Sequence, residues 1–253
     1  MDKNRTPQDK YYKKSNLNHI FVVIMYIIFT LLSLAQGFTN NHIILVFSAI
    51  SVILIFILEK FKDYYFDKGI LYRRVKLLDN TFNQLHEPEE AIFEYYDNEE
   101  IEPGIYKLFW NIYESAFFSH FIISKMLRLM FWYASIIFIL LLIFVLNFGI
   151  NIYSLLALSL VFSNAFFNRI YSLKSTKNSI EKILGKSAIL ADNMKNTVNN
   201  DDFMRRMMDI IINYESTIAE NKYNLSNKTY MKSREALNCE WNSIKKKYYL
   251  RND

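Results

Sequence analysis

The sequence predicts an all-α integral membrane protein, with four transmembrane helices in two hairpins and a cytoplasmic helical bundle. The runs 15–58 and 129–168 contain no Asp, Glu, Lys or Arg. Each run is long enough for two crossings and a turn, because one crossing takes about 20 helical residues. The rest of the chain is charged and shows helical apolar periodicity. Only five Gly and three Pro among 253 residues argue against a loop-rich or β-rich fold.

The alternation of charged and uncharged stretches divides the chain into five parts. Its net charge of +5 is unevenly spread, with an acidic middle and a basic C-terminal part. These two parts either attract each other, within or between subunits, or are ordinary solvated surface. The five parts are a cytoplasmic N-terminal segment (1–18), a transmembrane hairpin (19–60), a cytoplasmic helical segment (61–128), a second transmembrane hairpin (129–168) and a cytoplasmic C-terminal helical region (169–253).

The first hairpin begins with an apolar run over residues 20–35, after a Lys-rich leader. The small residues Ser33 and Ala35, separated by one residue, resemble a signal-peptide cleavage site, which is an alternative interpretation of this run. A second apolar run, however, begins almost at once, at Ile43. Residues 37–41 supply Gly and Asn, which tolerate the backbone conformations of tight turns. We therefore expect a turn there and a second span over residues 42–58.

The distribution of Lys and Arg predicts the orientation. The two short connections, 37–41 and 147–151, contain neither residue, whereas the four flanks on the other side are all basic. Because cytoplasmic flanks carry the excess of Lys and Arg, we expect both termini and the middle segment of this multi-pass membrane protein in the cytoplasm. The basic flanks are Lys13 and Lys14, Lys60 and Lys62, Lys125 and Arg128, and Arg169 and Lys174.

The second span is predicted to continue as a helix outside the membrane. Its apolar residues recur at spacings of three and four, which is typical of an amphipathic helix, and Gly69 is a candidate kink. Pro88 and Pro103, each beside acidic residues, favour helix starts. The second start leads into the third span, about 129–146. The stripe residues are Leu71, Val75, Leu78, Phe82 and Leu85 before Pro88, and Ile105, Leu108, Ile112 and Ala116 after Pro103.

The fourth span, about 152–168, is the most polar of the four. Polar side chains at membrane depth usually face water or a protein partner. They either line a pore made by several subunits or form hydrogen bonds between helices. The side chains concerned are Ser159, Ser163, Asn164 and Asn168.

Three amphipathic helices are expected after the fourth span. A break and cap is predicted at 199–201, and Ser226 or Asn227 is a candidate cap for the last helix. The apolar stripes are Leu173, Ile180, Leu184 and Ala191; Phe203, Met207, Ile211, Tyr214 and Ile218; and Tyr230, Leu237, Trp241, Ile244 and Tyr248.

Signals for catalysis, cofactors and metals are absent from the sequence. It has no Gly-rich phosphate loop, no metalloprotease motif and no Cys/His zinc cluster, so we expect neither an enzyme nor a bound cofactor. Its four His residues are scattered, and we expect them at interfaces or surfaces. The eight carboxylates of residues 87–102 fit no calcium loop and read better as surface or helix N-termini. The single Cys239 cannot form an internal disulfide and suits a reducing compartment.

Basic pairs outside the spans are candidates for contact with a phosphorylated messenger or an anionic lipid, because the guanidinium group binds phosphate through two parallel hydrogen bonds. The competing interpretation is a set of solvated helix faces. Because basic residues alternate with acids, we expect no nucleic-acid polymer as a partner. The candidate contacts are Arg73, Arg74, Arg205, Arg206 and Arg234, with a further basic run at 245–247.

This layout resembles the bacterial four-transmembrane effectors associated with cyclic-oligonucleotide synthases in anti-phage defence, the SMODS-associated class. The resemblance rests on the runs 20–58 and 129–168 around a cytoplasmic segment, with a distinctive stretch at 229–241. It covers nearly the whole chain as a layout and carries over no ligand-contact residues. It implies a non-enzymatic effector that disrupts the inner membrane under the control of a nucleotide signal or a protein partner.

Two functions from different classes follow from the sequence. The first is a homo-oligomeric effector in the lipid bilayer that forms a pore when its cytoplasmic helices sense a cyclic-nucleotide ligand or a cytoplasmic partner protein. The alternative is a membrane scaffold without a pore, whose cytoplasmic helices dock a partner protein. A small transporter is disfavoured, because no span contains a charged residue or a broken helix.

Overall fold

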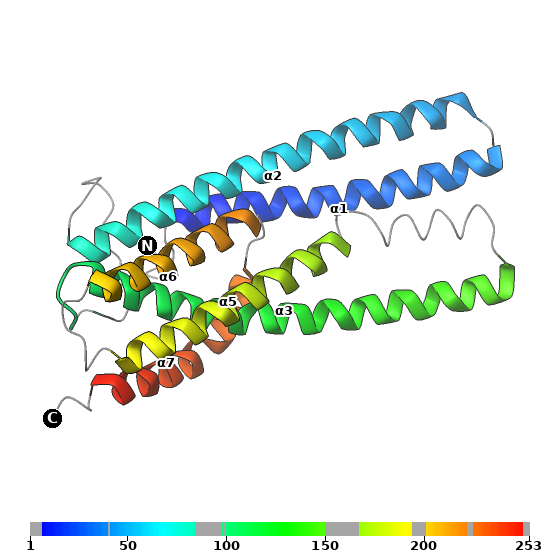
Figure 1. Ribbon diagram of the computed structural model, residues 1–253. Helices are drawn as coiled ribbons and strands as arrows, with labels where there is room; N and C mark the ends of the chain where they lie inside the picture. The colour runs from blue at the N-terminus through cyan, green and yellow to red at the C-terminus, as the bar shows by residue number, and fades with distance from the viewer. Residues whose placement is uncertain are drawn as a thin grey trace. The chain divides into compact units, whose positions relative to one another are not determined.

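Nearly all of the residues that the computed structural model describes lie in α-helices (Figure 1). The described residues are 7–39, 41–83, 98, 100–149, 167–193, 201–221 and 225–249. The chain divides into two compact units. We call Gln8–Gly69 with Leu127–Ser172 the hairpin unit, and Ile70–Met126 with Leu173–Asp253 and Met1–Pro7 the bundle unit. The predicted all-α fold is therefore confirmed for the described part of the chain.

The hairpin unit is built on α1 (Pro7–Thr39) and α2 (His42–Phe82), which lie side by side (Figure 1). Pro is favoured at the first helical position, where the missing N–H is not needed. The turn is shorter than the predicted 37–41, because α1 continues to Thr39. Asn41 caps α2, and its Oδ1 accepts a hydrogen bond from the backbone N–H of Ile43 at 2.9 Å.

Gly69 is a contact point between α1 and α2. The helix continues through it, and a Cβ atom placed there would lie 2.6 Å from Cε1 of Tyr12. The Tyr12 ring also packs on Phe66, with centroids 5.9 Å apart. The absence of a side chain at Gly69 therefore lets the aromatic ring of α1 rest directly on the α2 backbone.

We expect the Gly69→Leu substitution to destabilise the hairpin by about 1–3 kcal/mol, the usual effect of overpacking. The added side chain occupies the space of the Tyr12 ring. Thermal unfolding of the full chain in detergent would measure this loss. The double variant Gly69→Leu with Tyr12→Ala should recover most of it, and a Gly69→Leu variant as stable as the wild type would contradict the contact.

Three helices of the described residues are long and apolar enough to cross a membrane: α1, α2 and α3 (Ile105–Phe148). Their apolar stretches face outward. None of the most apolar 18-residue window of α3 is buried within the chain, and only 11% of those of α1 and α2. Because water disfavours such surfaces, lipid or another apolar partner must cover them.

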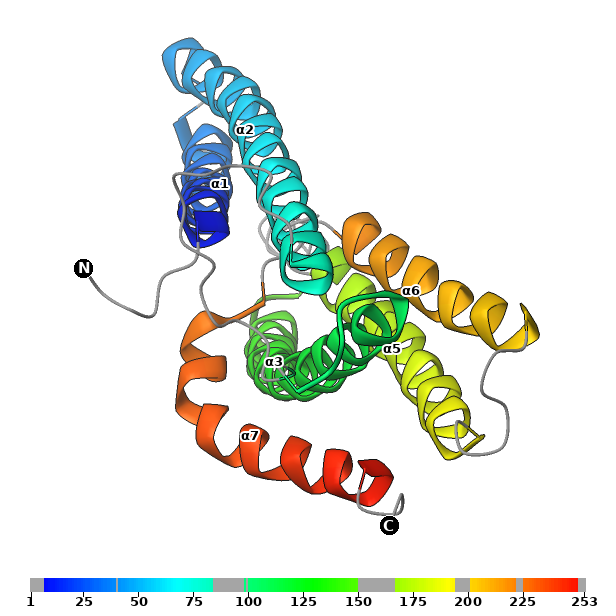
Figure 2. The ribbon, with the colours of Figure 1, turned by 90° about the vertical axis from the view of Figure 1, so that its left-hand side faces the viewer.

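The bundle unit is organised around α3, which lies between α7 (Asn227–Tyr249) on one side and the pair α5 (Phe167–Asn193) and α6 (Asp201–Asn221) on the other (Figure 2). Aromatic side chains join α3 to α7. The ring centroid of Trp241 lies 6.0 Å from that of Trp110 and 5.3 Å from that of Tyr113. Both tryptophan side chains are fully buried, so this cluster forms the centre of the core.

Most predicted apolar stripes are confirmed as core faces. The predicted helix from Pro103 also runs unbroken into the third span, as α3. Ser226 caps α7, since its Oγ accepts a hydrogen bond from the backbone N–H of Thr229 at 3.2 Å. The buried stripe residues are Leu108, Ile112 and Ala116 of α3, Leu173, Ile180 and Ala191 of α5, Met207, Ile211 and Tyr214 of α6, and Leu237 and Trp241 of α7.

The stripe predicted on α2 behaves differently. Leu71, Leu78 and Phe82 are exposed, whereas the apolar residues that α2 buries beside this stripe are Ile70 and Leu77. The helix itself is confirmed, but its core face is displaced from the expected stripe. Residues 150–166, between α3 and α5, are not among the described residues. Residues 152–166 of the predicted fourth span, with Ser159, Ser163 and Asn164, and the helix predicted from Pro88 therefore lie outside the described residues.

Candidate functional site

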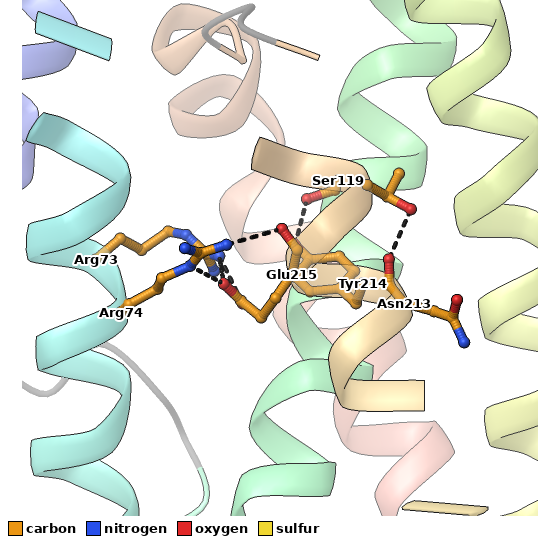
Figure 3. A network of polar contacts seen from close by, with 7 residues as sticks. Arg73, Arg74, Ser119, Asn213, Tyr214 and Glu215 are labelled. Carbon is orange, nitrogen blue, oxygen red and sulfur yellow. Dashed lines mark hydrogen bonds and ion pairs between the residues drawn. The ribbon is translucent and has the colours of Figure 1, made fainter. Parts of the chain in front are cut away.

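A charged cluster within the bundle unit joins α2 to α6 (Figure 3). Arg73 Nη2 donates to both carboxylate oxygens of Glu215 at 2.6 Å, and Arg74 Nε donates to Oε2 at 3.0 Å. Arg74 Nη2 also donates to the backbone carbonyl of Glu215 at 3.2 Å. One carboxylate thus holds two guanidinium groups, and these charge-assisted bonds are stronger than neutral ones. We call this group the Arg73–Arg74–Glu215 cluster.

Burial makes the Arg73–Arg74–Glu215 cluster energetically important. The side chains of Arg73 and Glu215 are only 10% and 16% exposed, whereas that of Arg74 is 43% exposed. Charges removed from water are poorly tolerated unless they are paired, so neither Arg73 nor Glu215 can lose its partner without a large penalty. Arg74 belongs to the solvent-facing side of the cluster.

Tyr214 fixes the position of this cluster against α3. Its hydroxyl group shares a 3.1 Å hydrogen bond with Ser119, and the guanidinium carbon of Arg73 lies 5.8 Å from the centre of its ring (Figure 3). Burial raises the pKa of the Tyr214 hydroxyl above its usual value, so the group remains neutral. The ring supplies a face for the Arg73 cation while its hydroxyl end is held by α3.

A second buried polar network joins the end of α2 to the beginning of α3. Asn98 Nδ2 donates to Oδ1 of Asn111 at 2.9 Å and to Oε2 of Glu114 at 2.8 Å. Asn111 Nδ2 in turn donates to Oδ1 of Asn80 at 2.9 Å. Asn98 and Asn111 are fully buried, and Glu114 is nearly so. This network gives the buried Glu114 carboxylate a hydrogen-bond donor and anchors Asn98 to α3.

Arg205 and Arg206 form a separate group at the N-terminus of α6. Both donate to the carboxylate of Asp202, at 2.9 and 2.7 Å. The hydrogen bonds from Arg205 and then Arg206 hold the pKa of that carboxyl group below its usual value. Ten residues separate Arg205 from Glu215, which is about 15 Å along a helix. The structure therefore does not bring the two predicted arginine pairs to one place.

The other predicted site residues are dispersed. Arg234 lies on α7 and is partly buried, and Asn168 lies exposed in the first turn of α5. Of the polar residues predicted for the fourth span, Asn168 is the one that the structure describes. Among described residues, no group of three His, Cys, Asp or Glu is placed to hold a metal ion.

Several interacting residues could not be found by sequence reasoning. Glu215 has no motif, and it pairs with Arg73 across 142 positions of sequence. Asn98, Asn111 and Glu114 are likewise ordinary polar residues until the fold brings them together. His19, expected at an interface, is partly buried and contacts Arg169 Nη1 through its Nε2 within the hairpin unit.

The helices and their exposed apolar stretches define a helical membrane protein. Comparisons of the chain with protein-family models, curated proteins and solved structures found no match. The particular function must therefore be argued from the residues of this chain.

Proposed function

We propose that the protein is a membrane effector of bacterial anti-phage defence that permeabilises the inner membrane when a nucleotide messenger or a partner protein acts on its cytoplasmic helices. The observation that carries the proposal is that α2 contains a candidate span and also carries Arg73 and Arg74, which are bonded to α6. A ligand that competes with Glu215 for these guanidinium groups changes the strength of the contact between α6 and α2, the helix that enters the bilayer.

The chemistry of the cluster fits an anionic ligand. A phosphate group offers oxygens that match the guanidinium fork as well as a carboxylate does. Arg74 is the accessible end of the cluster, and Glu215 occupies the anion position in the present structure. In this proposal, four spans per chain and several chains form the pore, with Ser159, Ser163, Asn164 and Asn168 of the fourth span facing its lumen.

One observation favours the alternative, a scaffold without a pore. Arg73 and Glu215 satisfy each other in a mostly buried pair, and such pairs also occur as purely structural elements. In that case the cytoplasmic helices dock a partner protein while the spans serve as an anchor.

Membrane potential separates the two functions. Bacteria that express the chain together with a cyclic-oligonucleotide synthase should lose the potential reported by a voltage-sensitive dye, whereas cells with either protein alone should keep it. The matched control is a synthase inactivated in its catalytic site. An unchanged potential in all strains, with the chain present in the membrane fraction, would contradict the effector and favour the scaffold.

A further inference from the structure

Beyond the predicted membrane exit at Glu59, the exposed large apolar side chains of α2 lie on one stripe. Their exposed fractions range from 39% to 60%. These positions follow the charged residues that mark the membrane edge. Leu71 lies twelve residues past Glu59, which is about 18 Å along the helix axis, so hydrocarbon cannot explain its exposure. The residues are Phe61, Tyr64, Leu71, Leu78 and Phe82.

The stripe follows a seven-residue repeat beyond the span. Apolar residues at two positions of a heptad, four and three residues apart, form the seam of a coiled coil. Six of the seven seam positions from Phe61 to Phe82 are apolar, and Lys68 is the exception. One series is Tyr64, Leu71 and Leu78; the other is Phe61, Lys68, Val75 and Phe82.

The chain's own core does not use this stripe. The buried apolar residues of α2 in this region are Phe66, Ile70 and Leu77. At 100° per residue, they lie about 80–140° around the helix from Leu71 and Leu78, on a different face. The helix therefore has one face for its own chain and a second apolar face that nothing in the described part of the chain covers.

The period of the repeat indicates what covers the second face. A straight helix has 3.6 residues per turn, so a strict seven-residue repeat drifts by about 20° in each heptad. Over the three heptads from Phe61 to Phe82 the drift reaches about 60°, and the residues remain on one seam only if the helix supercoils around a partner helix. A lipid surface imposes no such period.

We propose that α2 forms a parallel, in-register coiled coil with α2 of a second copy of the chain. Two copies in one membrane have the same orientation and depth, so each seam residue meets its own equivalent. A single Lys at a seam position, here Lys68, sets register and oligomeric state in coiled coils. The inference rests on the membrane insertion in the proposed function but not on permeabilisation.

Disulfide crosslinking in isolated membranes tests this contact. In a Cys239→Ser background, Leu71→Cys and Leu78→Cys place thiols on the seam, and Ile189→Cys on α5 is the control. Ile189 is 62% exposed and Leu71 is 60% exposed, so the two positions match in accessibility. A disulfide requires Cα atoms within about 7 Å. We expect mild oxidant to convert most of each seam variant to a covalent dimer, and at least fivefold less of the control.

Equal crosslinking at Leu71, Leu78 and Ile189 would show random collision and overturn the inference. Monomeric seam variants in the membrane fraction would also overturn it, while leaving the proposed permeabilisation open to its own test. A chain missing from the membrane fraction would overturn the inference and the proposed function together. The experiment uses no synthase, so its outcome does not depend on a messenger.

Discussion

Replacement of Glu215 by Lys is expected to lower the free energy of unfolding of the full chain by about 3–5 kcal/mol, the usual loss when one partner of a buried ion pair is removed. The substitution leaves Arg73, which is 10% exposed, without its carboxylate and adds a third cation beside it and Arg74. Thermal unfolding in detergent, followed by circular dichroism, would measure the loss.

Two further variants make the Glu215 result specific. Glu220→Lys makes the same charge change at an exposed position of the same helix, and we expect it to alter stability by no more than about 0.5 kcal/mol. The exchange of partners, Arg73→Glu with Glu215→Arg, should restore part of the stability. If Glu215→Lys and Glu220→Lys unfold at the same temperature, the cluster does not stabilise the bundle.

Truncation of Trp241 to Ala should also remove about 3–5 kcal/mol, the range for a large buried aromatic side chain. Trp241 is fully buried, and its ring packs on Trp110, Tyr113 and Phe117 of α3. Its loss leaves a cavity at the α3–α7 contact. We therefore expect lower thermal stability and faster proteolysis of α7.

The control for this prediction is Met231→Ala, which shortens an exposed apolar side chain of the same helix. Trp241→Phe should retain much of the stability, because the smaller ring still fills part of the site. A Trp241→Ala chain that unfolds at the wild-type temperature, with α7 still resistant to protease, would show that this aromatic cluster does not hold α7.

Much of the fold could be predicted from the sequence, because helical periodicity and hydropathy are local signals. Leu108, Ile112 and Ala116 recur at helical spacing and are buried as expected. The uncharged run that begins at Leu129 was likewise predicted to hold a span, and α3 there is long and apolar enough to cross a membrane.

Contacts between residues that lie far apart in the sequence could not be predicted from it. Arg73 and Arg74 suggested an anion site by their chemistry, but nothing near them in sequence indicated that Glu215 would fill it. Periodicity also cannot tell which partner an apolar stripe meets. The stripe with Leu71 and Leu78 was evident from its spacing, yet it faces away from the core of its own chain.

The most direct test of the effector is the membrane potential of cells that carry the wild-type chain or Glu215→Gln at equal abundance in the membrane, each with and without the cyclic-oligonucleotide synthase. Glutamine keeps the shape of the side chain but removes the charge that holds Arg73 and Arg74. We expect the wild type to depolarise the cells only with the synthase. We expect cells with the variant to have the same membrane potential with and without the synthase. A wild-type chain that leaves the potential unchanged with the synthase, or a variant that responds as the wild type does, would contradict control of the membrane through this cluster.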